Sequence, residues 1–294
     1  MVKVTVPAST ANIGPGFDTL GLALNLYNEY IFEESDKGLI IEGCPDIFNN
    51  KNNLVYKSFA ITAKKLGKRV KGLKISMNTN IPISRGLGSS SACIAGGVYG
   101  ANYLYNLGLS KDEMFKIAAA IEGHPDNIAP CIYGGLTASI MEKDIPYTIK
   151  YNISDKLKFC ALIPNFETST KEARKLLPKK IDFCDAVFNI SRVSVLLKAL
   201  EIGDINMIGI ALKDKLHQIY RATLIHECDD VSEICIVDGS SAIFISGSGP
   251  TLMNITDNDK LSEKIKDGIS KLKYEWEIKL LETDRNGVKV EIIK

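Results

Sequence analysis

Residues 82–93 read PISRGLGSSSAC, between the strand-like segment 73–81 and a helix-like segment that begins near residue 91. Gly86 and Gly88 lack a Cβ, so an anion can approach the backbone closely, and the following helix offers unpaired N–H groups at its N-terminus. The order strand, glycine-rich loop, helix therefore favours a phosphate site. A serine-rich cap that only begins a helix is the alternative, and both interpretations stay open at this point.

This glycine-rich loop matches neither of the two common nucleotide-binding motifs. The Gly-Lys-Ser/Thr ending of a Walker loop is missing, and the third glycine of GxGxxG is also missing. If a phosphate does lie against the loop, the hydroxyl of Ser90 is placed to approach a Mg²⁺ ion that bridges phosphate oxygens.

The rest of the chain mixes strand-like and helix-like patterns. Gly96, Gly97 and Gly100 in the helix after the loop would let its backbone approach a sheet closely, and Ser110 with Glu113 has the spacing of a capping box. Strands are predicted at 2–6, 22–34, 38–43, 73–79, 134–141, 157–163, 242–246, 276–282 and 288–293, and helices at 54–66, 91–107, 110–123, 170–177, 185–200, 203–212 and 260–273.

Length and composition limit the functional class. A chain of 294 residues suggests two domains, and the polar segment at 145–155 is the predicted boundary. The 36 basic and 35 acidic side chains create no overall field that would attract nucleic acid or an anionic membrane. No apolar run is long enough to span a membrane, and the first residues do not resemble a signal peptide, so we expect a cytoplasmic protein.

The seven cysteines are scattered, odd in number and without a CxxC pair. This pattern argues against a disulfide framework and against a zinc site. We therefore expect reduced cysteines in the core.

Two further segments concentrate polar side chains. Residues 7–24, PASTANIGPGFDTLGLAL, place Asn12 and Asp18 in a loop between two strand-like runs, where a plain turn also explains them. Residues 121–135, IEGHPDNIAPCIYGG, gather four polar side chains just past a helix, more than a simple connection needs: Glu122, His124, Asp126 and Asn127. A transition-metal site is poorly supported there, because no HxxxH accompanies the histidine.

Two segments in the second half of the chain have the sequence patterns of a capped helix and of a hairpin turn. Residues 163–178, IPNFETSTKEARKLLP, run from a strand into a short helix that Ser169 and Glu172 would cap, with Thr170 in its first turn and Arg174 one turn later. Residues 244–253, FISGSGPTLM, form a second Gly-Ser loop between strands, for which a hairpin turn is the ordinary interpretation.

These five stretches, taken together in this order, resemble the GHMP kinases, a family named after galactokinase, homoserine kinase, mevalonate kinase and phosphomevalonate kinase. The family motif Pro-x-x-x-Gly-Leu-Gly-Ser-Ser is matched by PISRGLGSS at 82–90, and its glycine-rich third motif by GSGP at 247–250. The stretches NIGPGFDTLGLAL, EGHPDNIAP and STKEAR resemble the homoserine kinase branch.

The resemblance implies an α+β fold with two domains. The N-terminal domain, at 1–150, would resemble a ribosomal protein with a left-handed βαβ crossover, and the C-terminal domain, at 151–294, would be ferredoxin-like. The implied reaction is the ATP-dependent phosphorylation of the side-chain hydroxyl of L-homoserine, in threonine biosynthesis. A homodimer is also implied.

The resemblance assigns roles to particular residues. Ser90 and Glu122 would hold Mg²⁺, and Asn53 would lie at the adenine. Asp18 suits the substrate ammonium, and Arg174 with Arg221 suits its carboxylate. The substrate pocket would comprise Asn12, Asp18, His124, Asn127, Arg174 and Arg221, the catalytic set Asn127, Thr170, Glu122 and Arg174, and the nucleotide site Asn53, Pro82, Ile83, Ser84, Arg85, Gly86, Leu87, Gly88, Ser89, Ser90, Ser91 and Ala92.

One departure affects the expected mechanism. Some relatives carry an aspartate base where this sequence has Asn127, and an amide cannot accept the proton. We therefore expect catalysis by positioning and electrostatic stabilisation, with Asp126 as the rival base. Ser91, where many relatives have alanine, is expected to be harmless, and the assignment of Arg221 rests on a looser match.

Three alternatives to this activity remain. One is a sister kinase that acts on a small alcohol such as mevalonate, and another is an inactive ligand sensor built on the same fold. The third is a nucleotide-binding structural subunit without a small-molecule pocket, which the polar residues at 122–127 argue against. The combination of Asp18 with Arg174 argues against a mevalonate-like substrate, which has no α-ammonium group.

Overall fold

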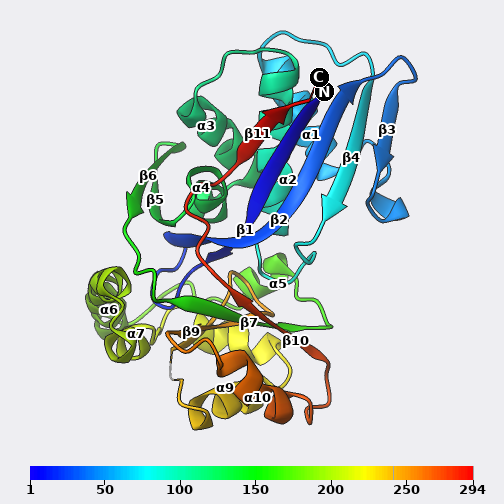
Figure 1. Cartoon of the computed structure of the whole chain (residues 1–294). Helices are drawn as coiled ribbons and strands as arrows, with labels where there is room; N and C mark the ends of the chain where they lie inside the picture. Colours follow the sequence, from blue (N-terminus) through cyan, green and yellow to red (C-terminus); the bar gives the residue numbers. More distant parts are fainter. Residues whose placement is uncertain (241, 294) are drawn as a thin grey trace.

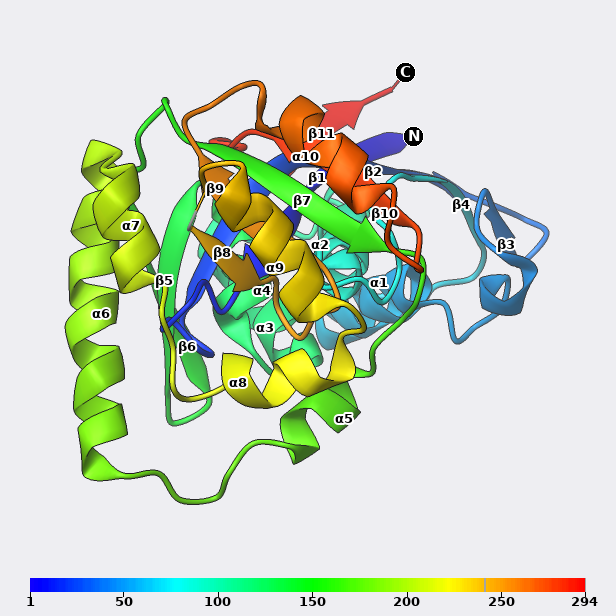
Figure 2. The same cartoon turned by 90° about the horizontal axis from the view of Figure 1, so that it is seen from below.

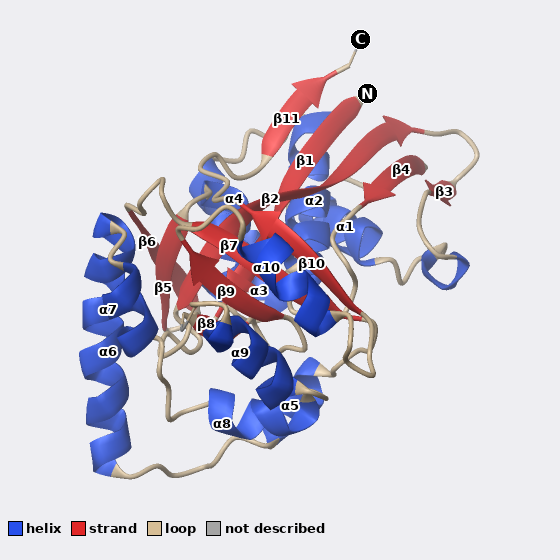
Figure 3. Cartoon of the chain, turned by 60° about the horizontal axis from the view of Figure 1, so that its bottom comes forward, coloured by secondary structure: helices blue, strands red, loops and turns tan. Residues whose placement is uncertain are grey.

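The computed structural model describes residues 1–240 and 242–293, and it contains two β-sheets with helices packed against each (Figures 1 and 3). The larger sheet has the strand order β11-β1-β2-β4-β3, and β5 pairs with β2 on one side and with β6 on the other. Its strands are β1 (Val2–Ala11), β2 (Leu20–Glu34), β3 (Leu39–Glu42), β4 (Leu73–Thr79), β5 (Leu136–Glu142), β6 (Ile145–Tyr151) and β11 (Lys289–Ile292).

The alternating sequence of β1 explains its place in the larger sheet. Val2, Val4 and Val6 are buried, whereas Lys3 and Thr5 between them are partly exposed, so one face of the strand turns toward the core. The long strand β2 pairs with β1 along most of its length and with β4 and β5 at its two ends. The strands predicted in this half of the chain are therefore confirmed.

Four helices pack on the larger sheet, α1 (Leu54–Lys65), α2 (Ser89–Leu104), α3 (Lys111–Glu122) and α4 (Pro125–Tyr133) (Figure 1). A Cβ at Gly96 would lie 2.4 Å from the Tyr30 ring, and one at Gly100 would lie 2.4 Å from the Phe32 ring. The close approach of α2 to β2 predicted from its glycines is confirmed. The predicted capping box at the start of α3 is also present.

Strand β3 runs parallel to β4, and helix α1 connects them, so the larger sheet contains the expected βαβ unit. All other strand pairs in this sheet are antiparallel. The chain ends in the same sheet, because β11 pairs with β1 and brings the two termini together (Figure 1).

The smaller sheet is antiparallel, with the order β10-β7-β9-β8, formed by β7 (Lys158–Pro164), β8 (Ile243–Ile245), β9 (Leu252–Thr256) and β10 (Trp276–Leu281). In chain order the spatial sequence is fourth, first, third and second strand, as in a ferredoxin-like βαββαβ unit. Helices α9 (Cys228–Val237) and α10 (Leu261–Ile269) pack with it around a second core that includes Leu162, Val231 and Ile265.

The remaining helices lie near the junction of the sheets or at one side of the molecule (Figure 2). The long helix α6 (Phe183–Ile202) and α7 (Ile205–Ala211) form a pair at that side, and α5 (Thr170–Lys175) and α8 (Gln218–Arg221) lie beside the junction. Two β-sheets, each with helices packed against it, confirm the α+β fold.

Several elements differ from the sequence-based prediction. Residues 145–151, predicted to hold a domain boundary, form the edge strand β6, which pairs with β5 and has Ile or Tyr at every second position, as a strand does. Helix α4 was missed because Pro125, Pro130 and a following glycine pair suggest a loop, although proline is favoured in the first turn of a helix. Helices α8 and α9 were also missed. A boundary near residue 150 stays a prediction.

All seven cysteines are free thiols, as predicted. Cys131, Cys160 and Cys235 are buried, but Cys184 is exposed and Cys44 lines the cavity, so the expectation that all of them lie in the core was wrong for these two. No helix among residues 1–240 and 242–293 is long and apolar enough to cross a membrane.

Candidate functional site

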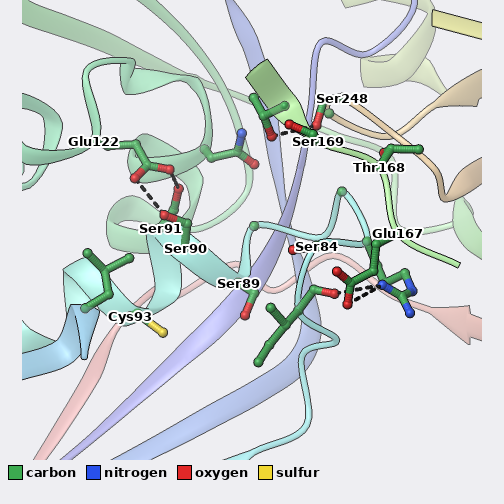
Figure 4. Close-up of a pocket in the computed structure, with 18 of the residues that line it drawn as sticks. Ser84, Ser89, Ser90, Ser91, Cys93, Glu122, Glu167, Thr168, Ser169 and Ser248 are labelled. Atoms are coloured by element: carbon green, nitrogen blue, oxygen red, sulfur yellow. Dashed lines mark hydrogen bonds and ion pairs between the residues drawn. The ribbon is translucent and has the colours of Figure 1, made fainter. Parts of the chain in front are cut away.

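A cavity of about 850 Å³ lies at the junction of the two sheets. Its walls come from both halves of the chain (Figure 4). The lining residues lie in 12–18, 44–54, 77–93, 122–127, 167–174 and 247–249, together with Asn28 and Arg221. All the segments singled out from the sequence therefore meet in one place.

The glycine-rich loop forms one wall of this cavity and leads into the N-terminus of α2. Gly88 caps the helix with a φ of 70°, and a Cβ there would lie 2.0 Å from the Ser9 hydroxyl. A Cβ at Gly86 would lie 2.3 Å from the Ser246 carbonyl oxygen. The loop can only be packed this tightly without side chains, and the free N–H groups of the first turn of α2 lie at the cavity wall.

The second Gly-Ser loop is a hairpin turn between β8 and β9, as predicted, and it also supports the first loop. The buried hydroxyl of Ser246 donates to the carbonyl oxygen of Gly86 over 2.6 Å, and the N–H of Gly247 donates to the carbonyl oxygen of Ala11 over 3.0 Å. Gly247, Ser248 and Gly249 line the cavity. The turn therefore joins three of the predicted segments.

Glu122 at the end of α3 reaches the start of α2 (Figure 4). The hydroxyl of Ser90 donates to Oε2 of Glu122 over 2.9 Å, and the hydroxyl of Ser91 donates to Oε1 over 2.9 Å. Ser91 is only 1% exposed. Each carboxylate oxygen is therefore held by one serine of the same helical turn, a contact for Ser91 that the sequence did not indicate.

This group of oxygens suits a hard divalent cation. Ser90 and Glu122 offer only oxygen ligands, and both line the cavity beside the helix N-terminus where an anion is favoured. Oxygen-only coordination completed by phosphate oxygens is the usual environment of Mg²⁺ in phosphoryl-transfer sites. The residues present therefore fit this ion.

Helix α4 presents its own N-terminus to the same cavity. His124 is the N-cap residue, Pro125 begins the helix, and Asp126 and Asn127 lie in the first turn. Asp126 is 5% exposed, and its burial, followed by the nearby negative charge of Asp18, raises its pKa to about 6. The carboxyl group of Asp126 can therefore gain and lose a proton near neutral pH.

Ser9 of β1 holds the amide of Asn127. Its hydroxyl donates to Oδ1 of Asn127 over 2.9 Å, so the amide nitrogen of Asn127 is left to donate elsewhere. Ser9 is fully buried and its own N–H donates to the carbonyl oxygen of Leu87. Sequence reasoning missed Ser9, because a serine in a strand gives no signal of its own.

Asn12 and Asp18 lie where β1 passes into β2. The side chain of Asn12 accepts from the N–H of Asp18 and donates to the carbonyl oxygen of Gly247, both over 2.8 Å. Asn12 therefore shapes the loop with both ends of its amide. The carboxylate of Asp18 forms a two-point ion pair with Arg174 of α5, with N–O distances of 3.1 and 2.9 Å.

Arg221 at the end of α8 is 2% exposed and lines the cavity. Its guanidinium donates to the carbonyl oxygen of Gly247 over 2.8 Å and lies 5.1 Å from the centre of the Phe17 ring. Among the described residues no carboxylate forms an ion pair with it, and its Nε has no hydrogen-bond partner. Burial lowers the pKa of Arg221.

Thr170 begins α5, where Ser169 is the N-cap residue. The Ser169 hydroxyl accepts from the N–H of Glu172, which confirms Ser169 as the N-cap of α5. The hydroxyls of Thr170 and Ser248 are 3.0 Å apart. Thr170 therefore links α5 to the second Gly-Ser loop at the cavity rim.

The residues expected at the nucleotide differ in how they face the cavity. Asn53 lines it, but its amide caps α1 by accepting from Val55 and Tyr56 and donates to the Phe48 carbonyl oxygen, so it is engaged within the protein. Ile83 to Gly86 and Gly88 to Ser91 line the cavity. Pro82, Leu87 and Ala92 do not lie among its lining residues, and Leu87 and Ala92 are fully buried.

Arg85 faces away from the loop toward the other half of the chain. Its guanidinium donates to the carbonyl oxygens of Pro164 and Asn165 and pairs with Glu167 over 3.2 Å. These contacts fix the glycine-rich loop against the end of β7.

Comparison with protein families gives two matches. Residues 53–135 match the GHMP kinases N terminal domain, and residues 196–275 match the GHMP kinases C terminal domain. The first matched region contains the glycine-rich loop, and the second contains the Gly-Ser loop between β8 and β9.

Three similar proteins illustrate the range of relatives. A homoserine kinase of Clostridium botulinum (strain Kyoto / Type A2) is 47% identical over 99% of this chain and 98% of its own. The structure of a homoserine kinase from Cytophaga hutchinsonii matches with a TM-score of 0.87 at 30% identity, over 99% of this chain and 97% of its own. A mevalonate kinase from L. major has a TM-score of 0.73 at 15% identity, over 97% and 96%, and shares the fold.

Proposed function

The chain belongs to the GHMP kinase family, among its homoserine kinases, and on that premise we propose how its cavity phosphorylates the side-chain hydroxyl of L-homoserine with ATP. One observation carries the residue assignment. A buried arginine, Arg221, and an acidic side chain, Asp18, line the same cavity as two helix N-termini. Such a cavity offers separate places for a zwitterion and for phosphates.

The nucleotide site is assigned to the glycine-rich loop and the first turn of α2. The N–H groups of this turn and the positive end of the helix stabilise the triphosphate, since no P-loop lysine is present. The adenine is assigned to the region of Asn53, Phe48 and Met77, which line the same cavity as the loop. Asn53 contributes there by fixing the backbone, because its amide is already hydrogen-bonded.

We assign Mg²⁺ to Ser90 and Glu122. The ion, when bound, neutralises charge on the phosphate oxygens. The hydroxyl of Ser90, in the first turn of α2, contacts one carboxylate oxygen of Glu122, and Ser91 holds the other.

The homoserine site is assigned to Asn12, Asp18, His124, Asn127, Arg174 and Arg221. Asp18 would accept hydrogen bonds from the ammonium group, and Arg221 would hold the carboxylate, with Arg174 as a second donor. The amide nitrogen of Asn127, oriented by Ser9, would donate to the oxygens at the reacting end. Thr170, at the cavity rim, is assigned to the transferring phosphate.

Two mechanisms for the hydroxyl proton remain. In the first, the protein only positions and stabilises, and the proton passes directly to the phosphate, which a loose transition state permits. In the second, Asp126 accepts the proton. The burial of Asp126 and its pKa of about 6 favour this second candidate, because a base works best when its pKa is near the operating pH.

A substrate panel tests the activity. ADP release is measured with L-homoserine, D-homoserine, L-threonine, L-serine and mevalonate. We expect L-homoserine to have the highest kcat/KM. Preference for mevalonate would support the sister-kinase alternative, and ATP binding without turnover of any alcohol would support the inactive sensor.

We also propose that the protein is a homodimer, as the family resemblance implies. Sedimentation equilibrium at micromolar concentration tests this, with twice the chain mass of 32.2 kDa as the expected result. A location in the cytoplasm stays a prediction from the sequence.

A further inference from the structure

The ion pair between Asp18 and Arg174 occupies the place where a substrate ammonium group is assigned. Both oxygens of Asp18 accept from Arg174, and the side chains are 29% and 42% exposed. Asp18 belongs to the β1–β2 connection and Arg174 to α5, so the pair joins two segments of the cavity wall that are far apart in the sequence. In the empty cavity, therefore, Asp18 already has a cationic partner.

Arg221 differs from Arg174 in this respect. It is buried, its Nε has no hydrogen-bond partner, and no carboxylate within the described residues pairs with it. Both guanidinium groups lie near the Phe17 ring, at 5.1 Å for Arg221 and 5.8 Å for Arg174. Asp18, Arg174 and Arg221 together carry a net charge of +1. The carboxyl groups of Asp126 and Asp214 also act on Arg221 electrostatically, but within the described residues neither forms an ion pair with it, so the guanidinium can still take an anion as a direct partner.

We propose that the Asp18–Arg174 ion pair is a specificity element that a ligand must exchange for its own two charges, so that the cavity selects a zwitterionic amino acid. This inference rests on the proposed assignment of the homoserine site. The carboxylate of the amino acid binds Arg221, and its ammonium replaces Arg174 at Asp18. The released Arg174 then gains the ligand carboxylate as a new partner.

A ligand with only one charge cannot complete this exchange of ion pairs. 4-Hydroxybutanoate, which is homoserine without the amino group, can reach Arg221 but leaves Arg174 paired with Asp18. 3-Aminopropan-1-ol, which lacks the carboxylate, displaces Arg174 and leaves two guanidinium groups without an anion. 4-Hydroxybutanoate therefore lacks the contact between an ammonium group and Asp18, and it also fails to free Arg174 for its carboxylate. 3-Aminopropan-1-ol lacks the contact between a carboxylate and Arg221, and it leaves the displaced Arg174 without a new partner.

The test is a double-mutant cycle on ligand affinity. Isothermal titration calorimetry measures the binding of 4-hydroxybutanoate, with a non-hydrolysable ATP analogue present, to the wild type, Asp18→Asn, Arg174→Gln and the double variant. Asp18→Asn frees Arg174, so we expect 4-hydroxybutanoate to bind about three to ten times more tightly than to the wild type. In the Arg174→Gln background we expect Asp18→Asn to give no such gain.

Two further variants complete the design. Arg174→Gln frees Asp18 and should tighten the binding of 3-aminopropan-1-ol, which keeps the test valid if Asp18→Asn does not fold. Asp155→Asn is the matched control, because it removes an exposed ion pair with Arg285 outside the cavity and should leave both affinities unchanged.

The outcomes separate this inference from the proposed function. An equal gain in both backgrounds would mean that Asp18 acts only as a repelling charge, and it would overturn the exchange. No gain, or no measurable binding to Asp18→Asn, would also overturn it. Failure of the wild type to phosphorylate L-homoserine would instead refute the proposed function, because the calorimetric cycle does not depend on turnover.

Discussion

The hydroxyl of Ser91 lies 2.9 Å from Oε1 of Glu122, to which it donates, while Ser90 holds the other oxygen of the same carboxylate. Ser91 is almost fully buried, so this contact restrains the carboxylate from inside the protein. Since Glu122 is a proposed metal ligand, we infer that Ser91 positions it. The sequence alone predicts that serine in place of alanine at this position has no effect.

Ser91→Ala should weaken divalent metal binding about tenfold, because hydrogen-bonding partners of metal ligands affect affinity by about 10- to 100-fold. Mn²⁺ titration followed by electron paramagnetic resonance, with a non-hydrolysable ATP analogue present, measures this directly. Ser139→Ala is the control, since Ser139 is equally buried but donates to Thr148 outside the cavity. Equal metal affinity in Ser91→Ala and the wild type would contradict the positioning role.

Ser90→Ala should weaken Mn²⁺ binding at least as strongly as Ser91→Ala, because it removes a proposed ligand as well as a contact to Glu122. The same titration checks the order of the two variants. A larger loss in Ser91→Ala than in Ser90→Ala would exchange the roles of the two serines.

Gly88→Ala should destabilise the protein more than Gly67→Ala. Both glycines have φ values near 70°, where an L side chain costs about 1–2 kcal/mol, but a Cβ at Gly67 meets nothing within 4 Å. At Gly88 the Cβ would lie 2.0 Å from the Ser9 hydroxyl, so the loop must move as well. Thermal unfolding and ATP-analogue affinity are measured for both, and only Gly88→Ala should lose nucleotide binding. Similar behaviour of the two variants would mean that the packing of the loop on Ser9 is unimportant.

Asp126→Asn should stabilise the folded protein at pH 7 to 8. The pKa of Asp126 is raised from 3.8 to about 6, so the folded state binds the proton more tightly than the unfolded state, and stability falls as pH rises from about 4 through 6. Above this window the buried carboxylate costs about 1–3 kcal/mol, which the amide removes. Chemical denaturation at pH 3.5 and 7.5 checks the sign, since the gain should disappear at the lower pH.

The same variant separates the two mechanisms. If the proton passes directly to phosphate, Asp126→Asn should lower kcat less than about tenfold while homoserine binding is retained. General-base catalysis contributes about 10²- to 10⁴-fold, so a loss of that size, together with the disappearance of an ionisation near pH 6 in the kcat profile, would identify Asp126 as the base.

Local sequence patterns correctly predicted most of the strands, loops and helices that hold the site. The strand, loop and helix around Gly86 and Gly88 have the expected order, and the hairpin at Gly247 is where the sequence placed it. Helix α4 could not be foreseen, because its stability comes from packing on β1, β2 and β5 and not from the propensity of a segment with two prolines.

The side-chain partners in the site were beyond prediction for a similar reason. The contacts of Ser9 with Asn127 and of Asp18 with Arg174 join residues more than 100 positions apart, and no local pattern specifies them. The Asn53 amide differs, because an asparagine directly before the helix predicted at 54–66 is a typical N-cap, so a local pattern does indicate its engagement within the protein. Motif positions therefore identified which residues gather at the cavity, but not which of them are free to meet a ligand.

The identity of the product tests the central claim most directly. The wild-type protein is incubated with ATP, Mg²⁺ and L-homoserine, and the product is examined by ¹H–³¹P correlation NMR. We predict a phosphate monoester whose phosphorus couples to the terminal methylene protons of homoserine, with one equivalent of ADP formed. Release of inorganic phosphate with homoserine unchanged, or phosphate attached to any other position, would contradict this account.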